Sequence, residues 1–128
     1  MKYLILFILL FYSCNSNFKK SYKIGEIKLY ELQCSNQYYL SLENCDCKDL
    51  PKNYFIPVGE KDSFFEIFIK ENKGKLQVNS LYNKFITFGN IEEKIDFIIH
   101  TDNASFMDSI EKVNYTVIRG YINGRMNP

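Results

Sequence analysis

The strongest constraint on the fold is the spacing of apolar residues downstream of residue 23, where short alternating runs follow one another along the chain. Ser63–Lys70 shows the pattern most clearly, because Phe65, Ile67 and Ile69 fall on one face while Phe64 and Phe68 fall on the other. A period of two is typical of β-strands. Further strands are predicted at Ile24–Gln33, Tyr38–Leu42, Tyr54–Val58, Lys75–Asn79, Lys84–Phe88, Lys94–His100 and Tyr115–Ile122.

Turn-forming residues separate these runs. Glu71–Gly74 predicts a tight hairpin turn in which Gly74 takes a positive φ. Ser35–Asn36 and Gly59–Asp62 carry the residues that favour turns. Pro57 is expected at a sheet edge or a strand end, because proline cannot donate a ladder hydrogen bond.

One segment, Asp102–Lys112, has helical rather than strand spacing. Phe106, Ile110 and Val113 recur every three or four residues, and Asp102 or Asn103 is suited to be the N-cap. We therefore expect a mainly β domain with one short helix and about eight strands. Because helices do not alternate with the strands, these should pair antiparallel, in a meander or a small barrel.

The N-terminus is an apolar segment of a different kind. Lys2 is followed by Tyr3–Tyr12, an unbroken run of ten apolar or aromatic residues. A membrane-spanning helix needs about 20 such residues. The run instead matches the length of the apolar core of a signal peptide, and Ser13 and Cys14 follow it directly.

Met1–Cys14, with a small residue immediately before the cysteine, resembles the lipobox of bacterial lipoproteins. The resemblance implies that residues 1–13 are removed as a signal peptide and that Cys14 receives a diacylglyceryl group. That lipid would attach the protein to a membrane of the bacterial cell envelope. Phe11 stands where the motif usually has leucine. An ordinary secretory signal and an uncleaved N-terminal anchor are therefore kept as alternatives.

The remaining chain of about 115 residues is the size of one domain. We expect residues 14–22 to be the lipidated cysteine and a polar tether, residues 23–123 the β-rich domain, and residues 124–128 a polar tail. The sequence has 16 basic and 15 acidic residues, and removal of Lys2 makes these numbers equal. Proteins that bind nucleic acid usually carry a basic patch. None is evident, so no nucleic-acid partner is predicted.

Three cysteines follow Cys14, and export would place them in an oxidising compartment. Cys34 ends a predicted strand, while Cys45 and Cys47 lie in the loop after the next strand. We expect one disulfide between Cys34 and one of the other two, which leaves one spare thiol. Three reduced thiols without a special role, and a thiol–disulfide or metal site, are the alternatives.

No metal or catalytic site is predicted. Zinc sites typically space their cysteines C-x₂₋₄-C, whereas Cys45 and Cys47 are separated by one residue, and His100 is the only histidine. His100 and Asp102 resemble a general-base pair with Ser105 or Ser109 nearby, but no nucleophile elbow is present. The acidic cluster Glu92, Glu93 and Asp96 lacks EF-hand spacing and is expected to be a solvated face. We therefore predict neither an enzyme nor a cofactor.

The function expected from these features is that of a small cell-envelope lipoprotein whose domain binds another envelope protein. Phe64 and Phe68 share a strand face with Glu66, and this face would be an apolar binding patch if nothing covers it. Two alternatives remain at this point. One is a lipid or small-molecule carrier of β-barrel type, and the other is a soluble secreted protein that contains a disulfide.

Overall fold

The computed structural model describes residues 17–35, 37–59, 63–81 and 83–122. The predicted signal peptide, Cys14, Asn36, most of the turn at 59–62 and the polar tail lie outside these residues. The described residues form nine strands and two helices. Their bounds are β1 Phe18–Ile24, β2 Ile27–Cys34, β3 Gln37–Ser41, β4 Tyr54–Val58, β5 Ser63–Asn72, β6 Lys75–Leu81, β7 Lys84–Phe88, α2 Ile91–Lys94, β8 Ile95–His100, α3 Asn103–Lys112 and β9 Thr116–Ile122.

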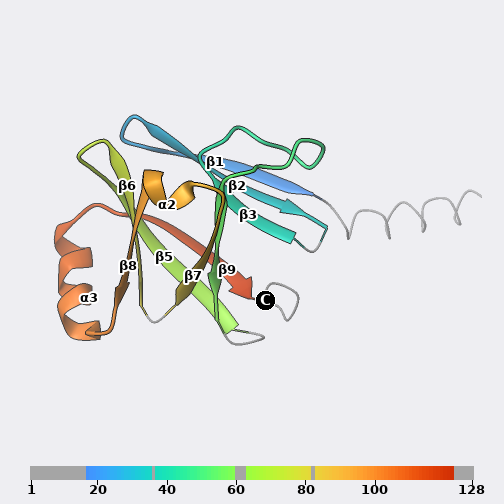
Figure 1. The fold of residues 1–128 in the computed structure, drawn as a ribbon. Coiled ribbons are helices and arrows are strands. Elements are labelled where there is room, and N and C mark those ends of the chain that lie inside the picture. The colour runs from blue at the N-terminus through green and yellow to red at the C-terminus, as the bar shows by residue number, and fades with distance from the viewer. Residues whose placement is uncertain (1–16, 36, 60–62, 82, 123–128) are drawn as a thin grey trace, which may run out of the picture.

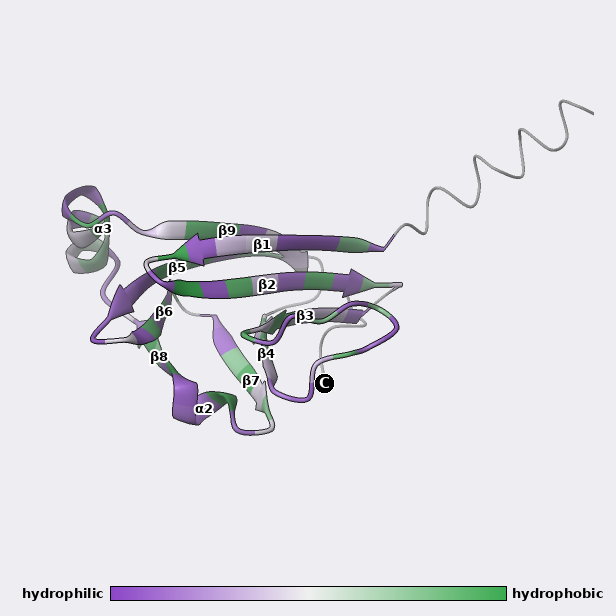
Figure 2. Cartoon of the chain, turned by 90° about the horizontal axis from the view of Figure 1, so that it is seen from above, coloured by the Kyte–Doolittle hydropathy of each residue, from purple (hydrophilic) through white to green (hydrophobic). Residues whose placement is uncertain are grey.

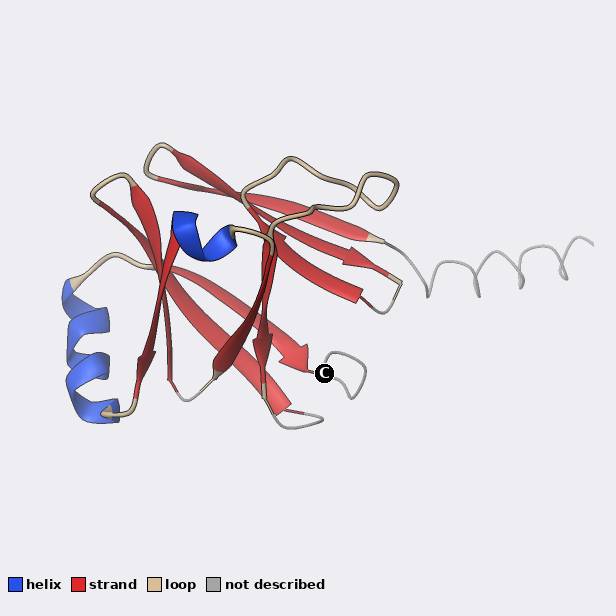
Figure 3. Cartoon of the chain, in the orientation of Figure 1, coloured by secondary structure: helices blue, strands red, loops and turns tan. Residues whose placement is uncertain are grey.

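The strands form two sheets, one in the order β1-β2-β3-β4-β7 and the other in the order β8-β6-β5-β9 (Figures 1 and 3). The prediction of a mainly β fold is confirmed. β1 to β4 pair in sequence order as an antiparallel meander, as expected. Over the described residues the two sheets stay separate and do not close into a barrel. Pro57 is the second-last residue of β4, as expected for a strand end. It lies beyond Phe55, the β4 residue that pairs with Leu40 of β3.

The main core lies between the two sheets. Figure 2 shows hydrophobic and hydrophilic bands alternating along β2, as expected for a strand with one face against a core. Phe55 is fully buried, and its ring centroid lies 5.9 Å from Phe85 and 5.0 Å from Phe97. It therefore packs β4 against both β7 and β8. The predicted inward face of β5 belongs to the same cluster: Phe65, Ile67 and Ile69.

The expectation that all strands pair antiparallel is wrong at one place. β8 pairs parallel with β6, with Leu76 opposite Ile95 and Leu81 opposite His100. After β6 the chain crosses to the other sheet as β7, turns through α2 and returns, so it enters β8 in the direction of β6. Apolar residues alternate with a period of two in both parallel and antiparallel strands. The sequence pattern therefore could not predict that β8 pairs parallel with β6. α2 is a single turn that the sequence did not predict, and its first residue, Ile91, is buried.

Residues 18–22, expected to be part of a tether, lie within strand β1. The strand pairs with β2 from Phe18 opposite Gln33 to Ile24 opposite Ile27. Among the described strands it is the edge strand of its sheet and has a neighbour on one side only. Lys19, Lys20 and Lys23 give it the charged character that protects edge strands from pairing with other chains. The same lysines interrupt the apolar alternation, so the sequence pattern was not typical of a strand.

The predicted helix and hairpin turn are confirmed. Asp102 is the N-cap of α3, and its carboxylate accepts a hydrogen bond from the Ser105 amide at 3.3 Å. Phe106 of α3 packs edge-on against Phe68 of β5, with ring centroids 5.3 Å apart, so the helix covers one end of the outer face of that sheet. Lys73 and Gly74 have φ values of 54° and 82°, the left-handed region that a two-residue hairpin turn requires.

Candidate functional site

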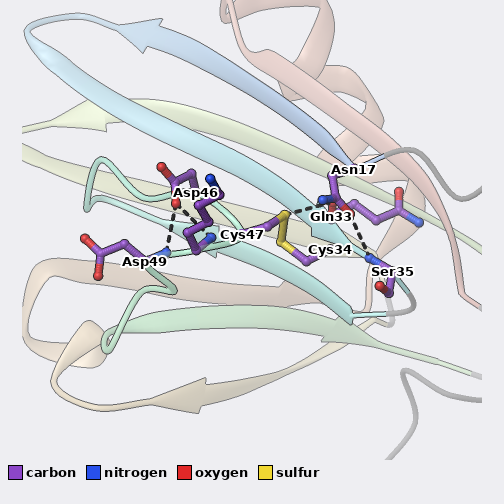
Figure 4. Close-up of a disulfide and its surroundings, with 8 residues drawn as sticks. Asn17, Gln33, Cys34, Ser35, Asp46, Cys47 and Asp49 are labelled. Carbon is purple, nitrogen blue, oxygen red and sulfur yellow. Dashed lines mark hydrogen bonds between the residues drawn. A yellow bond between two sulfur atoms is a disulfide. The ribbon is translucent and has the colours of Figure 1, made fainter.

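The loop between β3 and β4 is joined to the end of β2 by a disulfide. Cys34 and Cys47 are bonded, with a Cα–Cα distance of 5.5 Å (Figure 4). This agrees with the expected pairing and selects Cys47 over Cys45. Asp46 orders the loop locally, because its carboxylate accepts hydrogen bonds from the amides of Lys48 and Asp49, both at 2.8 Å. The disulfide therefore holds the loop across the outer face of the five-stranded sheet.

Cys45 is the spare thiol and is buried beneath this loop with Leu32 and Tyr39. Burial is the main cause that raises the pKa of the Cys45 thiol. The thiol, rather than the nucleophilic thiolate, is therefore the stable form near neutral pH. Cys45 acts here as a small apolar core residue.

A cavity of about 420 Å³ lies between the first three strands of one sheet and the free edge of the other. We call it the Glu31 pocket. Figure 1 shows that β1 begins and β9 ends at the same side of the molecule. Phe18 and Tyr121, near these two strand ends, both line the pocket. Its walls combine aromatic rings with groups of both charges. The lining residues are Phe18, Lys20, Tyr22, Glu31, Gln33, Tyr38, Phe65, Arg119, Gly120 and Tyr121.

Glu31 is the most unusual residue of the pocket, because its charged side chain is only 6% exposed. The Tyr22 hydroxyl donates to one carboxylate oxygen at 3.0 Å, and the Tyr38 hydroxyl donates to the other. Desolvation, followed by the nearby negative charge of Glu31, raises the pKa of both tyrosines well above its usual value. Both hydroxyls therefore remain protonated and able to donate. The ion pairs of the described residues, Lys75–Asp96 and Arg119–Glu66, do not include Glu31.

The positive side of the pocket comes mainly from Lys20. Lys20 stands directly opposite Glu31 in the pairing of β1 with β2, yet its ammonium lies over the Tyr22 ring, 4.9 Å from the centroid. Arg119 is at the rim, where its Nε–H bonds Glu66. Gly120 also lines the pocket, and a Cβ at this position would collide with the Phe65 ring. The pocket thus offers a buried carboxylate, a nearby ammonium and several rings.

The tyrosine–carboxylate contact predicts how stability depends on alkaline pH. The pKa of Tyr38 is raised by folding above its ordinary value of about 10, so the folded chain keeps a proton that the unfolded chain loses above that pH. Stability should therefore fall as pH rises through about 10 and beyond. Tyr38→Phe should lower stability near neutral pH by about 1–3 kcal/mol, because Glu31 loses a donor, and should flatten the alkaline decline.

Urea unfolding between about pH 8 and pH 11 measures both effects, with Tyr30→Phe as the control tyrosine on the opposite face of β2. An alkaline decline of equal slope in the Tyr38→Phe chain and the parent would contradict this account.

The residues considered for catalysis make local contacts instead of converging. His100 Nε2 lies 2.8 Å from Asn79 Oδ1, and the ring stacks on Phe106 with centroids 3.9 Å apart. Burial lowers the pKa of His100. Asp102 caps α3, and the Ser109 hydroxyl donates to the Phe106 carbonyl at 2.7 Å.

The acidic cluster is also divided among local contacts. The Thr87 hydroxyl donates to Glu92 at 2.6 Å, and Asp96 pairs with Lys75 at 3.1 Å. Within the part of the chain that the structure describes, no group of three or more histidine, cysteine, aspartate or glutamate side chains is arranged to hold a metal ion.

A second surface feature lies on the outer face of the four-stranded sheet. Phe64 of β5 is 78% exposed and Tyr121 of β9, directly opposite, is 47% exposed; their ring centroids are 5.2 Å apart. We call this pair the aromatic patch. A groove of about 330 Å³ adjoins Phe64 and is lined also by Leu81 and Asn83. The predicted Phe64–Phe68 face is therefore covered at the Phe68 end by α3 and open at the Phe64 end.

The Glu31 pocket was not predicted from the sequence, although one signal was present. Ile27, Leu29 and Glu31 have the same parity on β2, so Glu31 places a charge on a face that is otherwise apolar. Lys20 and Tyr22 could not be placed because they were assigned to a tether. The convergence of β1 and β9 depends on the arrangement of the two sheets, which the local pattern does not specify.

Comparison with known proteins gives no relative: no family model, no curated protein and no solved structure matches this chain. Among the described residues, no helix has both the length and the apolar character needed to cross a membrane.

Proposed function

We propose that this chain is a small lipoprotein of the bacterial cell envelope whose β domain binds another protein through the aromatic patch. The anchor rests on the sequence of Met1–Cys14. Two or three acyl chains on Cys14 would hold the protein stably, since each buried CH₂ contributes about 0.8 kcal/mol and a single chain holds only marginally.

The observation that carries the binding role is the exposure of Phe64 beside Tyr121. Phe64 lies near the start of β5 and is 78% exposed, so most of its apolar surface is not removed from water in the free protein. The adjoining groove gives a partner side chain a concave place to enter. The Glu66–Arg119 ion pair borders the patch. Protein interfaces commonly combine tyrosine, phenylalanine and arginine in this way, with apolar anchors at the centre and polar groups at the rim.

The test is a paired capture and binding experiment. Tagged protein is recovered from membranes of its native host after mild solubilisation, and partners of the parent chain are compared with those of Phe64→Ser/Tyr121→Ser. The double variant should lose at least about tenfold in partner recovery, because removal of two central aromatic anchors typically costs more than 1 kcal/mol each. The recovered partner is then purified and its Kd measured against both chains.

Met107→Ser is the matched control, because Met107 is an exposed apolar residue on α3, away from the patch. It should retain the partner. Equal recovery of the same partner by the parent and the double variant would reject the aromatic patch as the binding surface.

A further inference from the structure

The Glu31 pocket contains a buried carboxylate, which has no part in the proposed protein interface. A buried carboxylate without a cationic partner is costly unless hydrogen bonds or a counter-charge offset the loss of water. The two tyrosine hydroxyls supply part of that compensation. Each carboxylate oxygen has a second lone pair that can accept from a ligand. The site is therefore prepared to receive one further donor, and a cationic donor most of all.

The ammonium group of Lys20 is close to the Glu31 carboxylate but does not form an ion pair with it. Residues directly opposite on neighbouring strands have their Cβ atoms about 4.5–5.5 Å apart, so Lys20 can reach Glu31. Its ammonium instead lies over the Tyr22 ring. The two charges thus stand side by side and unpaired with each other. A ligand with adjacent charges of opposite sign would satisfy both.

The remaining walls indicate the rest of the ligand. Tyr38 and Phe65 are buried and their rings lie 5.7 Å apart, while Phe18 and Tyr121 are about half exposed at the opening. A volume of about 420 Å³ is near the lower end of the range for small-molecule pockets. Such a site suits a small ligand with an apolar side group rather than a long lipid chain.

We propose that the Glu31 pocket binds a free α-amino acid with an apolar or aromatic side chain. The ligand ammonium would donate to Glu31, the ligand carboxylate would face Lys20, and the side chain would contact the rings of Tyr38 and Phe65. This site is distinct from the aromatic patch, although Tyr121 belongs to both. Binding of the amino acid does not require the proposed protein partner.

The test uses the full chain purified in detergent and the twenty standard amino acids as probes, with binding detected by ligand-observed NMR and measured by calorimetry. At least one apolar amino acid should bind saturably. If that is L-phenylalanine, phenethylamine lacks the carboxylate and 3-phenylpropanoate lacks the ammonium. Each should bind about tenfold more weakly or worse, because each loses a charge-assisted contact. For another amino acid, the corresponding amine and acid are used.

Two variants locate the site. Glu31→Gln and Lys20→Met should each weaken binding by about ten- to a hundred-fold. Lys20→Met changes an exposed side chain and keeps the proposal testable if Glu31→Gln fails to fold. Lys23→Met is the matched control, because it removes a lysine from the opposite face of the same strand. The proposal is overturned if no amino acid of the panel binds, or if Lys20→Met binds the same amino acid as tightly as the parent.

Discussion

Cys14→Ala is expected to move the protein from the membrane fraction to the soluble fraction. In the proposed anchor the lipid is attached to the Cys14 thiol, and an alanine cannot form the thioether to diacylglycerol. The intact mass of the parent chain, recovered from its own membranes, should correspond to a chain that begins at Cys14 plus diacylglyceryl and acyl groups. The variant should lack that added mass entirely.

Cys45→Ala is the matched control, because it removes another cysteine of the same chain without touching the signal. It should keep both the added mass and the membrane location. A parent chain without added lipid would reject the anchor, and Cys14 would then be a fourth cysteine of a soluble secreted protein. That outcome would favour the second alternative left open by the sequence.

Removal of the disulfide is expected to have the largest effect on stability. Cys34 and Cys47 are 13 residues apart in sequence, and a closed loop of this size stabilises the folded state by about 3 kcal/mol in the chain-entropy model. For a domain of about 115 residues this corresponds to a fall in Tm of about 12 °C. The double variant Cys34→Ser/Cys47→Ser avoids a new bridge to Cys45, and calorimetry under oxidising conditions measures the difference.

The parent chain in a strong reductant is the internal control, and its Tm should fall to that of the double variant. Cys45→Ala should keep most of the parent stability and all of its sensitivity to reductant. A double variant that unfolds at the parent temperature would show that the bridge does not stabilise the folded chain.

Most of the individual strands could be predicted because each has one face against the core. The alternation in β5 follows directly from the burial of Phe65, Ile67 and Ile69 between the sheets. The same reasoning failed for β1, where the exposed edge position allows Lys19 and Lys20. It also could not specify the direction of β8, since a parallel and an antiparallel strand bury the same alternate residues.

The candidate sites could be predicted only in part, because some of their residues come together only through the arrangement of several strands. Cys34 was identified because cysteines are few and their compartment was inferred from the N-terminus. The sequence predicted that Phe64 would belong to an apolar patch if nothing covered its strand face. The structure shows that α3 covers Phe68 but not Phe64. Glu31 was missed because its significance depends on Tyr22 and Tyr38, which come from two other strands.

The early start of β1 limits how far the domain can extend from a membrane. Only three residues lie between Cys14 and Phe18, and a fully extended chain advances at most about 3.6 Å per residue. A lipid on Cys14 would therefore hold the edge of the five-stranded sheet within about 14 Å of the bilayer surface. The Glu31 pocket, which Phe18 helps to line, would then lie close to the bilayer surface. A partner or ligand would then have to bind this protein near the membrane surface, because a linker of three residues is too short to let the domain move far from it.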